Sequence, residues 1–242
     1  MAFKTALLSL VLTLAAWAQD AKKKDEEAKA KLAEYRKELK SCKTDADVVK
    51  VLEGLGSLQH PKVLTELKGW LGKGSVESAI AAAEQIGKYK KDKDAAESLA
   101  GAAGARREKD AVVKFLRYAG DVGYKPTTAR LVGFFRNKET DVAREAIDSC
   151  AKLKSRDAVD PIISMGRELE SIKEEKDTGG LGGGVLGGGV TGGVNNDNQV
   201  RKQTLLPAAI TALEQICGQK FATIKAADDW WRKNKGSFKE LE

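Results

Sequence analysis

The sequence predicts an all-α protein built from successive pairs of short amphipathic helices. Apolar residues recur with the helical period, aromatic residues make up 6% of the chain, and Ala, Leu and Val supply most of the apolar side chains. This composition suits closely packed helices better than aromatic-rich strands. At 242 residues, with 32% charged and 42% hydrophobic, the chain is long enough for one or two compact domains or a single extended array.

The first 18 residues have the parts of a secretory signal peptide. Lys4 gives a positive start, residues 6–16 form an apolar run, and Ala16-Trp17-Ala18 is a small-x-small cleavage site. The run is shorter than the roughly 20 residues that span a bilayer. We therefore expect cleavage after Ala18 and a secreted or periplasmic protein, with an uncleaved membrane anchor as the alternative.

Residues 19–43 are rich in Lys, Glu and Ala, and their apolar positions follow a heptad spacing: Ala28, Leu32, Tyr35, Leu39 and Cys42. Two heptads are too few for a free-standing coiled coil. The segment is therefore predicted to be a charged N-terminal capping helix that covers the first of the helical pairs described next. A dimerising helix is the alternative.

Residues 44–169 are predicted to form four helical pairs. Thr44 and Asp47 have the pattern of a capping box, and Pro61 suits the first turn of a helix. The expected pairs are 44–55 with 61–72, 75–87 with 94–103, 110–120 with 126–135, and 141–151 with 158–169. Each first helix ends near a small residue at position 56, 87, 120 or 151, so the steps are 31, 33 and 31 residues, and Cys217-Gly218 is a fifth occurrence. Because one pair buries too little apolar surface to stand alone, the period predicts a right-handed α-solenoid of about five pairs.

Two short motifs resemble bacterial exported HEAT-repeat proteins. Asp141, Val142, Arg144 and Ala146 resemble the Asp-x-x-Val-Arg-x-x-Ala start of such repeats. Gly218-Gln219-Lys220-Phe221 and the Trp-Trp segment 229–234 resemble the tail that closes those arrays. The resemblance covers residues 44–169 and 200–218 in outline and implies a binding fold without naming a ligand. Residues 200–242 are accordingly expected to form the last HEAT-like repeat and a C-terminal cap, in which one of Trp230 and Trp231 is buried and the other is partly exposed.

Residues 170–199 are predicted to be a glycine-rich flexible insertion. Ten of the 24 glycines lie between Gly179 and Gly193. Val185, Leu186, Val190 and Val194 are unusual for a pure linker, so a transient β-ribbon or a partner contact is the alternative.

No complete catalytic, metal or cofactor motif is present. Gly182-x-Gly184-x-x-Gly187 lacks the strand and helix of a dinucleotide site, and Ser149-x-x-Lys152 lacks the companion motifs of penicillin-binding enzymes. His60, the single histidine, is expected to serve a turn or cap, and Cys150 and Cys217 are expected to be buried thiols rather than a disulfide. We predict no catalytic residues, metal or cofactor, although a hydrolase with an unrecognised site stays an alternative.

Basic residues gather in the predicted turns between first and second helices, where stacking would align them along one edge. The formal net charge is +7, and the candidate anion- or partner-binding residues are Lys88, Lys90, Lys91, Lys93, Lys125, Lys152, Lys154 and Arg156. The leading functional hypothesis is a monomeric, non-catalytic scaffold that binds a protein partner. An anionic polysaccharide or lipid surface is the alternative ligand, and export makes nucleic acid a poor candidate.

Overall fold

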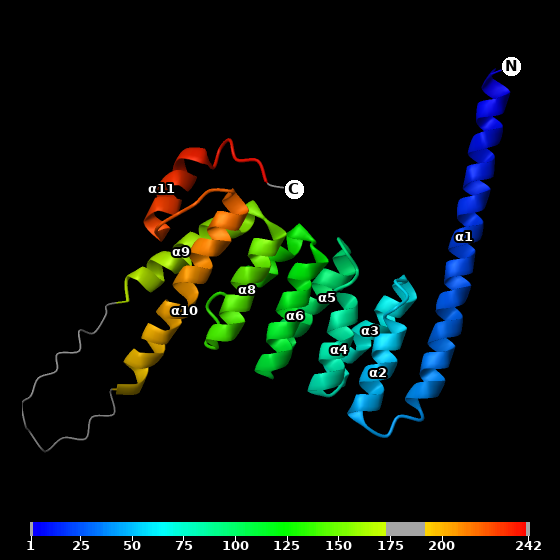
Figure 1. Cartoon of the computed structure of the whole chain (residues 1–242), viewed down its shortest axis with the longest axis horizontal. Coiled ribbons are helices and arrows are strands. Elements are labelled where there is room, and N and C mark those ends of the chain that lie inside the picture. The colour runs from blue at the N-terminus through cyan, green and yellow to red at the C-terminus, as the bar shows by residue number, and fades with distance from the viewer. Residues whose placement is uncertain (1, 173–191, 241–242) are drawn as a thin grey trace, which may run out of the picture. The chain divides into compact units, whose positions relative to one another are not determined.

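The computed structural model describes residues 2–172 and 192–240, and side chains from Lys22 to Ile172 and from Asp197 to Glu240 together with Gln19. Within these ranges all regular structure is helical and no strand occurs (Figure 1). The chain folds into two compact units, Met1–Tyr89 and Lys90–Glu242. The predicted all-α class is therefore confirmed.

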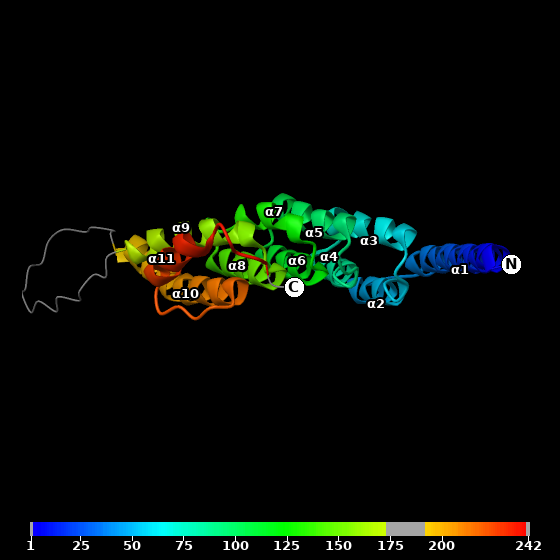
Figure 2. The same ribbon diagram turned by 90° about the horizontal axis from the view of Figure 1, so that it is seen from above.

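The first unit contains α1 (Ala2–Leu39), α2 (Asp45–Leu55), α3 (Pro61–Lys73) and α4 (Val76–Ile86). Helix α1 packs on α2 and α3, and both of these pack on α4, with α3 in one layer and α2 and α4 in the other (Figure 2). The heptad positions Ala28, Leu32 and Tyr35 are buried in this contact. The side chains of the predicted signal peptide, 1–18, lie outside the described residues. In the part of the chain whose side chains are described, no helix is long and apolar enough to cross a membrane.

Local capping fixes the helix starts of this unit. The Thr44 side chain accepts from the Asp47 N–H while Asp47 accepts from the Thr44 N–H, which completes the predicted capping box before α2. Pro61 opens α3, and Ser75 caps α4. These three starts agree with the sequence pattern because the interactions span only three residues.

The second unit contains the other helices: α5 (Lys93–Ala105), α6 (Lys109–Val122), η1 (Lys125–Thr127), α7 (Thr128–Val132), α8 (Thr140–Leu153), η2 (Arg156–Ala158), α9 (Val159–Glu170), α10 (Gly192–Cys217) and α11 (Ile224–Asn234). Helices α6, α8 and α10 pack side by side in chain order, and α5, α7 and α9 lie in the other layer (Figure 2). Each helix of that layer packs on the next helix along the chain: α5 on α6, α7 on α8 and α9 on α10. Helix α11 packs on α9 and α10.

The second predicted pair is divided, because α4 belongs to the first unit and α5 to the second. The packing explains this division. Helix α4 buries its apolar face against α2 and α3, whereas α5 buries its face against α6.

The third predicted pair differs from its expected bounds. Helix α6 continues past Gly120 to Val122 and ends at Gly123, whose φ of 78° is left-handed. Gly120 instead allows close helix approach, because a Cβ there would meet Ser149 Cβ of α8 at 2.8 Å. The second helix, expected over 126–135, is reduced to the short elements η1 and α7.

The predicted insertion 170–199 is shorter in the structure. Helix α9 ends at Glu170 and α10 begins at Gly192, so residues 192–199 extend the helix of the last predicted repeat. Residues 173–191, which include eight of the ten glycines of the predicted insertion, lie outside the described part of the chain.

Candidate functional site

Basic residues from successive turns of the second unit lie next to one another. Lys90 Nζ donates to the Asp121 carbonyl at 2.7 Å, and the Lys91 N–H donates to the Val122 carbonyl at 2.6 Å. Lys152 Nζ lies 2.7 Å from Asp121 Oδ1. Positions 90, 121 and 152 are each 31 residues apart, and Lys90 and Lys152 both contact Asp121.

The carboxylate of Glu240 contacts two of the predicted basic residues in this unit. Lys125 Nζ lies 2.9 Å from Glu240 Oε2, and the Arg156 N–H donates to Glu240 Oε1 at 2.9 Å. These contacts lower the pKa of Glu240, the Arg156 N–H having the larger effect and Lys125 the next. Glu240 was not identified from the sequence, because 115 residues separate it from Lys125 and no local pattern links them.

The remaining predicted cations are less closely grouped. Lys93 lies 4.0 Å from Glu97 of its own helix, and Lys154 ends α8 with a left-handed φ of 49°. Lys88 belongs to the first unit, where its Nζ donates to Gln85 Oε1 at 2.5 Å. Within the second unit, the predicted cations Lys93, Lys125 and Lys152 are each paired with an acidic side chain.

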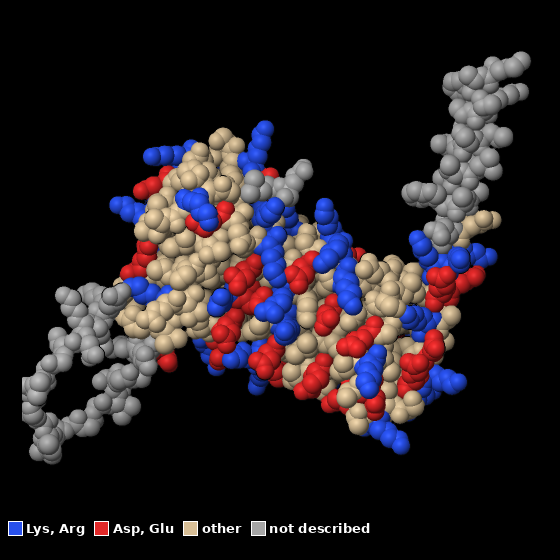
Figure 3. All heavy atoms as spheres, in the orientation of Figure 1, with Lys and Arg blue, Asp and Glu red and all other residues tan. Residues whose placement is uncertain are grey.

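Ion pairs also join neighbouring helical segments of the second unit. Arg117 of α6 contacts both carboxylate oxygens of Glu145 in α8, with the shortest distance 2.7 Å. Lys109 lies 3.0 Å from Asp141, and Arg136 pairs with Glu168. On the drawn face of this unit, positive and negative side chains alternate (Figure 3). Opposite charges from neighbouring helical segments thus neutralise each other within the protein.

A groove of about 780 Å³ lies among the segment before α8, the end of α9 and the start of α10. Four apolar residues line it, and three of them, Phe135, Met165 and Leu169, are nearly buried. Val200, also in the lining, is 49% exposed and is the one exposed large hydrophobic residue among the described side chains. The groove thus combines apolar surface with a rim of both charges, which includes Asp197, Glu139 and Lys138.

Arg201 fixes one wall of this groove. Its guanidinium donates to the carbonyls of Phe135 at 2.9 Å and Asn137 at 2.6 Å. Burial lowers the pKa of Arg201, and two of its N–H groups are hydrogen-bonded to backbone carbonyls. The side chain therefore ties α10 to the segment before α8 and shapes the groove.

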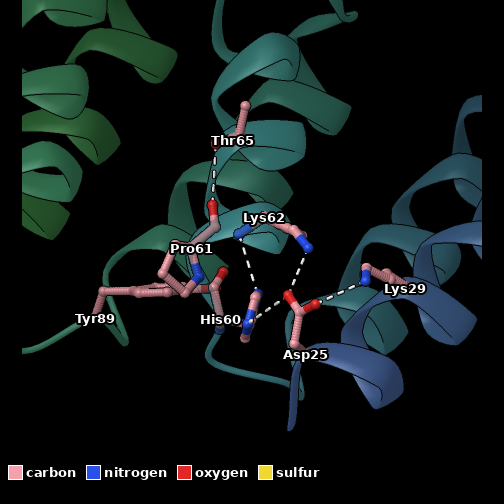
Figure 4. Close-up of polar contacts among 7 residues, drawn as sticks. All are labelled: Asp25, Lys29, His60, Pro61, Lys62, Thr65 and Tyr89. Carbon is pink, nitrogen blue, oxygen red and sulfur yellow. Dashed lines mark hydrogen bonds and ion pairs between the residues drawn. The ribbon is translucent and has the colours of Figure 1, made fainter. Parts of the chain in front are cut away.

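The first unit has a separate polar cluster around His60 (Figure 4). His60 Nδ1 accepts from the Lys62 N–H at 3.2 Å, which confirms the predicted cap, and its Nε2 lies 3.6 Å from Asp25 of α1. Asp25 also pairs with Lys29 at 2.8 Å and Lys62 at 2.5 Å. Lys29 and Lys62 lower the pKa of Asp25 to about 2, Lys29 having the larger effect. Because Asp25 of α1 contacts both His60 and Lys62, the cluster joins α1 to the start of α3.

Ser149, Cys150 and Cys217 are buried. Ser149 is 0% exposed, and its hydroxyl donates to the Leu116 carbonyl at 2.9 Å, so it cannot meet a substrate. Cys150 and Cys217 are free buried thiols, as predicted, and burial raises their pKa to about 12 and 11. In the described ranges, no cluster of three or more His, Cys, Asp or Glu side chains is arranged to hold a metal ion.

The two predicted cap tryptophans have different environments. Trp231 is 2% exposed and its Nε1 donates to Asp160 Oδ1 at 2.9 Å, whereas Trp230 is half-buried between Phe221 and Phe238. This confirms the expectation that the two indoles differ in burial.

Comparison of the chain with models of known protein families and with curated proteins finds no match.

Proposed function

We propose that the protein is an exported, non-catalytic α-solenoid of HEAT-like repeats that binds a protein partner. The contacts that recur one repeat apart support the solenoid. They include Arg117 with Glu145, Lys109 with Asp141, and Lys152 with Asp121. On this proposal α1 caps the first repeat and α11 caps the last.

The groove next to α10 is the observation on which partner binding rests. Its apolar residues and exposed Val200 suit apolar side chains of a bound segment, while the rim offers both donors and acceptors. A polyanion is less suited to this rim, because Glu139, Asp141, Glu168 and Asp197 would repel it. The partner proposed for the groove is therefore a protein segment of mixed polarity.

Site-specific crosslinking tests this proposal. A photoreactive residue replaces Val200 in the chain that starts at Gln19, and the protein is incubated with an envelope fraction. The control places the same residue at Arg144, which is exposed on α8 and does not line the groove. We expect a discrete crosslinked protein at Val200 and none at Arg144. Equal crosslinking at both positions, or none at Val200, would contradict the proposal.

A second candidate, binding of an anionic polysaccharide or lipid surface, is favoured by the alignment of the turns at positions 90, 121 and 152. Salt titration separates the two candidates. Affinity for a polyanion falls steeply with ionic strength, whereas binding in the groove changes less. A Lys90→Ala/Lys152→Ala variant weakens polyanion binding alone.

A further inference from the structure

The C-terminal segment 235–240 lies against two turns of the predicted basic edge. Glu240 places one carboxylate oxygen 2.9 Å from Lys125 Nζ and the other 2.9 Å from the Arg156 backbone nitrogen. The Arg156 guanidinium in turn donates to the Lys235 carbonyl at 3.1 Å. Lys125 and Arg156, both candidate binding residues from the sequence, thus hold a carboxylate supplied by the chain itself.

Phe238 gives the same segment an apolar contact. Its ring packs edge-on against Trp231, with centroids 5.3 Å apart, and against Trp230, with centroids 6.3 Å apart. Such aromatic pairs add to the free energy of area burial. The segment therefore contacts the protein through an aromatic side chain and, two residues later, through an acid.

Apart from the bond to the Lys235 carbonyl, these contacts are made by side chains of the segment. Residues 236–240 form no regular helix, and Glu240 stays 31% exposed while Phe238 is half-buried. The receiving surface, in contrast, is formed by the packed elements η1, η2 and α11. A surface that accepts an aromatic and an acidic side chain from a short extended segment can accept the same pair from another chain.

We propose that this surface is a binding site for a protein segment with an aromatic residue followed two positions later by Asp or Glu, and that Phe238 and Glu240 occupy it as an internal ligand. The proposal rests on the proposed function only in that the partner is a protein. A segment tethered a few residues from its site has an effective concentration in the millimolar range. The partner must therefore displace segment 235–240, called the tail below, and release of this tail raises the partner's affinity.

Peptide binding in trans tests the site directly. The probe is a fluorescein-labelled peptide with the sequence of residues 236–242, and its anisotropy is measured with the full chain and with a Phe238→Ala/Glu240→Gln variant. We expect at least about tenfold tighter binding to the variant, because its own tail no longer competes. Peptides with the equivalent of Phe238→Ala or Glu240→Gln are expected to bind at least about tenfold more weakly than the parent peptide.

Two further substitutions show where the peptide binds. Each is added to the Phe238→Ala/Glu240→Gln variant, called the released-tail variant. Lys125→Ala is expected to lower the affinity for the peptide about tenfold. Lys152→Ala removes a side chain that pairs with Asp121 instead, and it is expected to leave the affinity unchanged. Circular dichroism checks that each variant is folded. Glu240→Gln alone, which leaves Phe238 on the tryptophans, provides a milder second variant and is expected to give a smaller gain.

Equal peptide affinity for the full chain and a folded released-tail variant would overturn the proposal. Indifference to Lys125→Ala would do the same. A concentration-dependent dimer that Phe238→Ala/Glu240→Gln abolishes would identify the occupant as a second copy of the chain and would also overturn it. Crosslinking at Val200 is independent of these measurements, so the groove and the tail site can fail separately.

Discussion

The indole nitrogen of Trp231 donates a hydrogen bond of 2.9 Å to Asp160 Oδ1 and thereby joins α11 to the start of α9. Lys235 Nζ lies 2.7 Å from the other carboxylate oxygen of Asp160, and Arg167 of α9 pairs with Asp228 of α11. One buried aromatic side chain and two ion pairs therefore attach α11 and the residue after it to α9.

Replacement of Trp231 is expected to destabilise the second unit strongly. Trp231→Ala removes a side chain that is 2% exposed and should cost about 3–5 kcal/mol, whereas Trp231→Phe keeps most of the packing and should cost about 1 kcal/mol for the lost hydrogen bond. Guanidinium unfolding followed by circular dichroism measures both. Trp230→Ala, at the half-buried neighbour, is the control, and an equal loss there would contradict the assignment of Trp231 as the anchor.

Gly120 is expected to tolerate no side chain, because the Ser149 backbone of α8 lies 3.0 Å from the place of its Cβ. Gly120→Ala should lower the free energy of unfolding by about 1–3 kcal/mol through overpacking. Gly101→Ala in α5 is a matched control, since its nearest atom is 3.9 Å away, and it should be neutral or stabilising by up to about 1 kcal/mol. Thermal unfolding of the two variants checks the difference, which similar melting temperatures would disprove.

The Arg117 and Glu145 pair is expected to show strong coupling. Glu145 is 9% exposed at its side chain, so Arg117→Met leaves a carboxylate without its partner and should cost about 1–3 kcal/mol. The double variant Arg117→Met/Glu145→Leu should recover much of that loss, because two apolar side chains replace both charges. A double-mutant cycle in urea measures the coupling. Additive costs of the two single changes would show that the pair is unimportant.

Asp25 is expected to make attachment of α1 sensitive to acid. Its pKa is lowered from 3.8 to about 2 in the folded protein, so its contribution is complete above about pH 4 and is lost as the pH falls through about 2. The difference in unfolding free energy between the parent chain and Asp25→Asn should therefore shrink over this interval. Glu34→Gln, at an exposed acid of the same helix, serves as control. A difference that stays constant from pH 6 to pH 2 would refute the linkage.

The three cysteines are expected to differ in reactivity. Burial raises the pKa of Cys150 to about 12 and that of Cys217 to about 11, whereas Cys42 is only partly buried. At pH 8 an aromatic disulfide reagent should modify Cys42 rapidly and the other two only after unfolding. Cys42→Ser should remove the rapid phase. Three thiols should react in denaturant, and recovery of a single thiol would instead indicate a bond between Cys150 and Cys217.

Features that depend on neighbouring residues could be predicted from the sequence. The capping box of Thr44 and Asp47, the cap at His60 and the buried heptad positions of α1 each involve residues within one or two helical turns. The sequence spacing predicted neighbouring turns, and Lys90 and Lys152 both contact Asp121. For these features, local hydrogen bonding and side-chain periodicity are sufficient.

Only the tertiary structure showed which residues that are distant in the sequence contact each other. Gly120 looks like a helix terminator in the sequence but is a point of close contact with Ser149, and Glu240 neutralises Lys125 from the far end of the chain. The division at Tyr89 likewise follows from which neighbours bury α4 and α5. The sequence by itself determined an all-helical chain of recurring amphipathic segments, because helix periodicity is a local property. Which surfaces meet, and which charges remain for a ligand, depends on the packing of segments that lie far apart in the sequence.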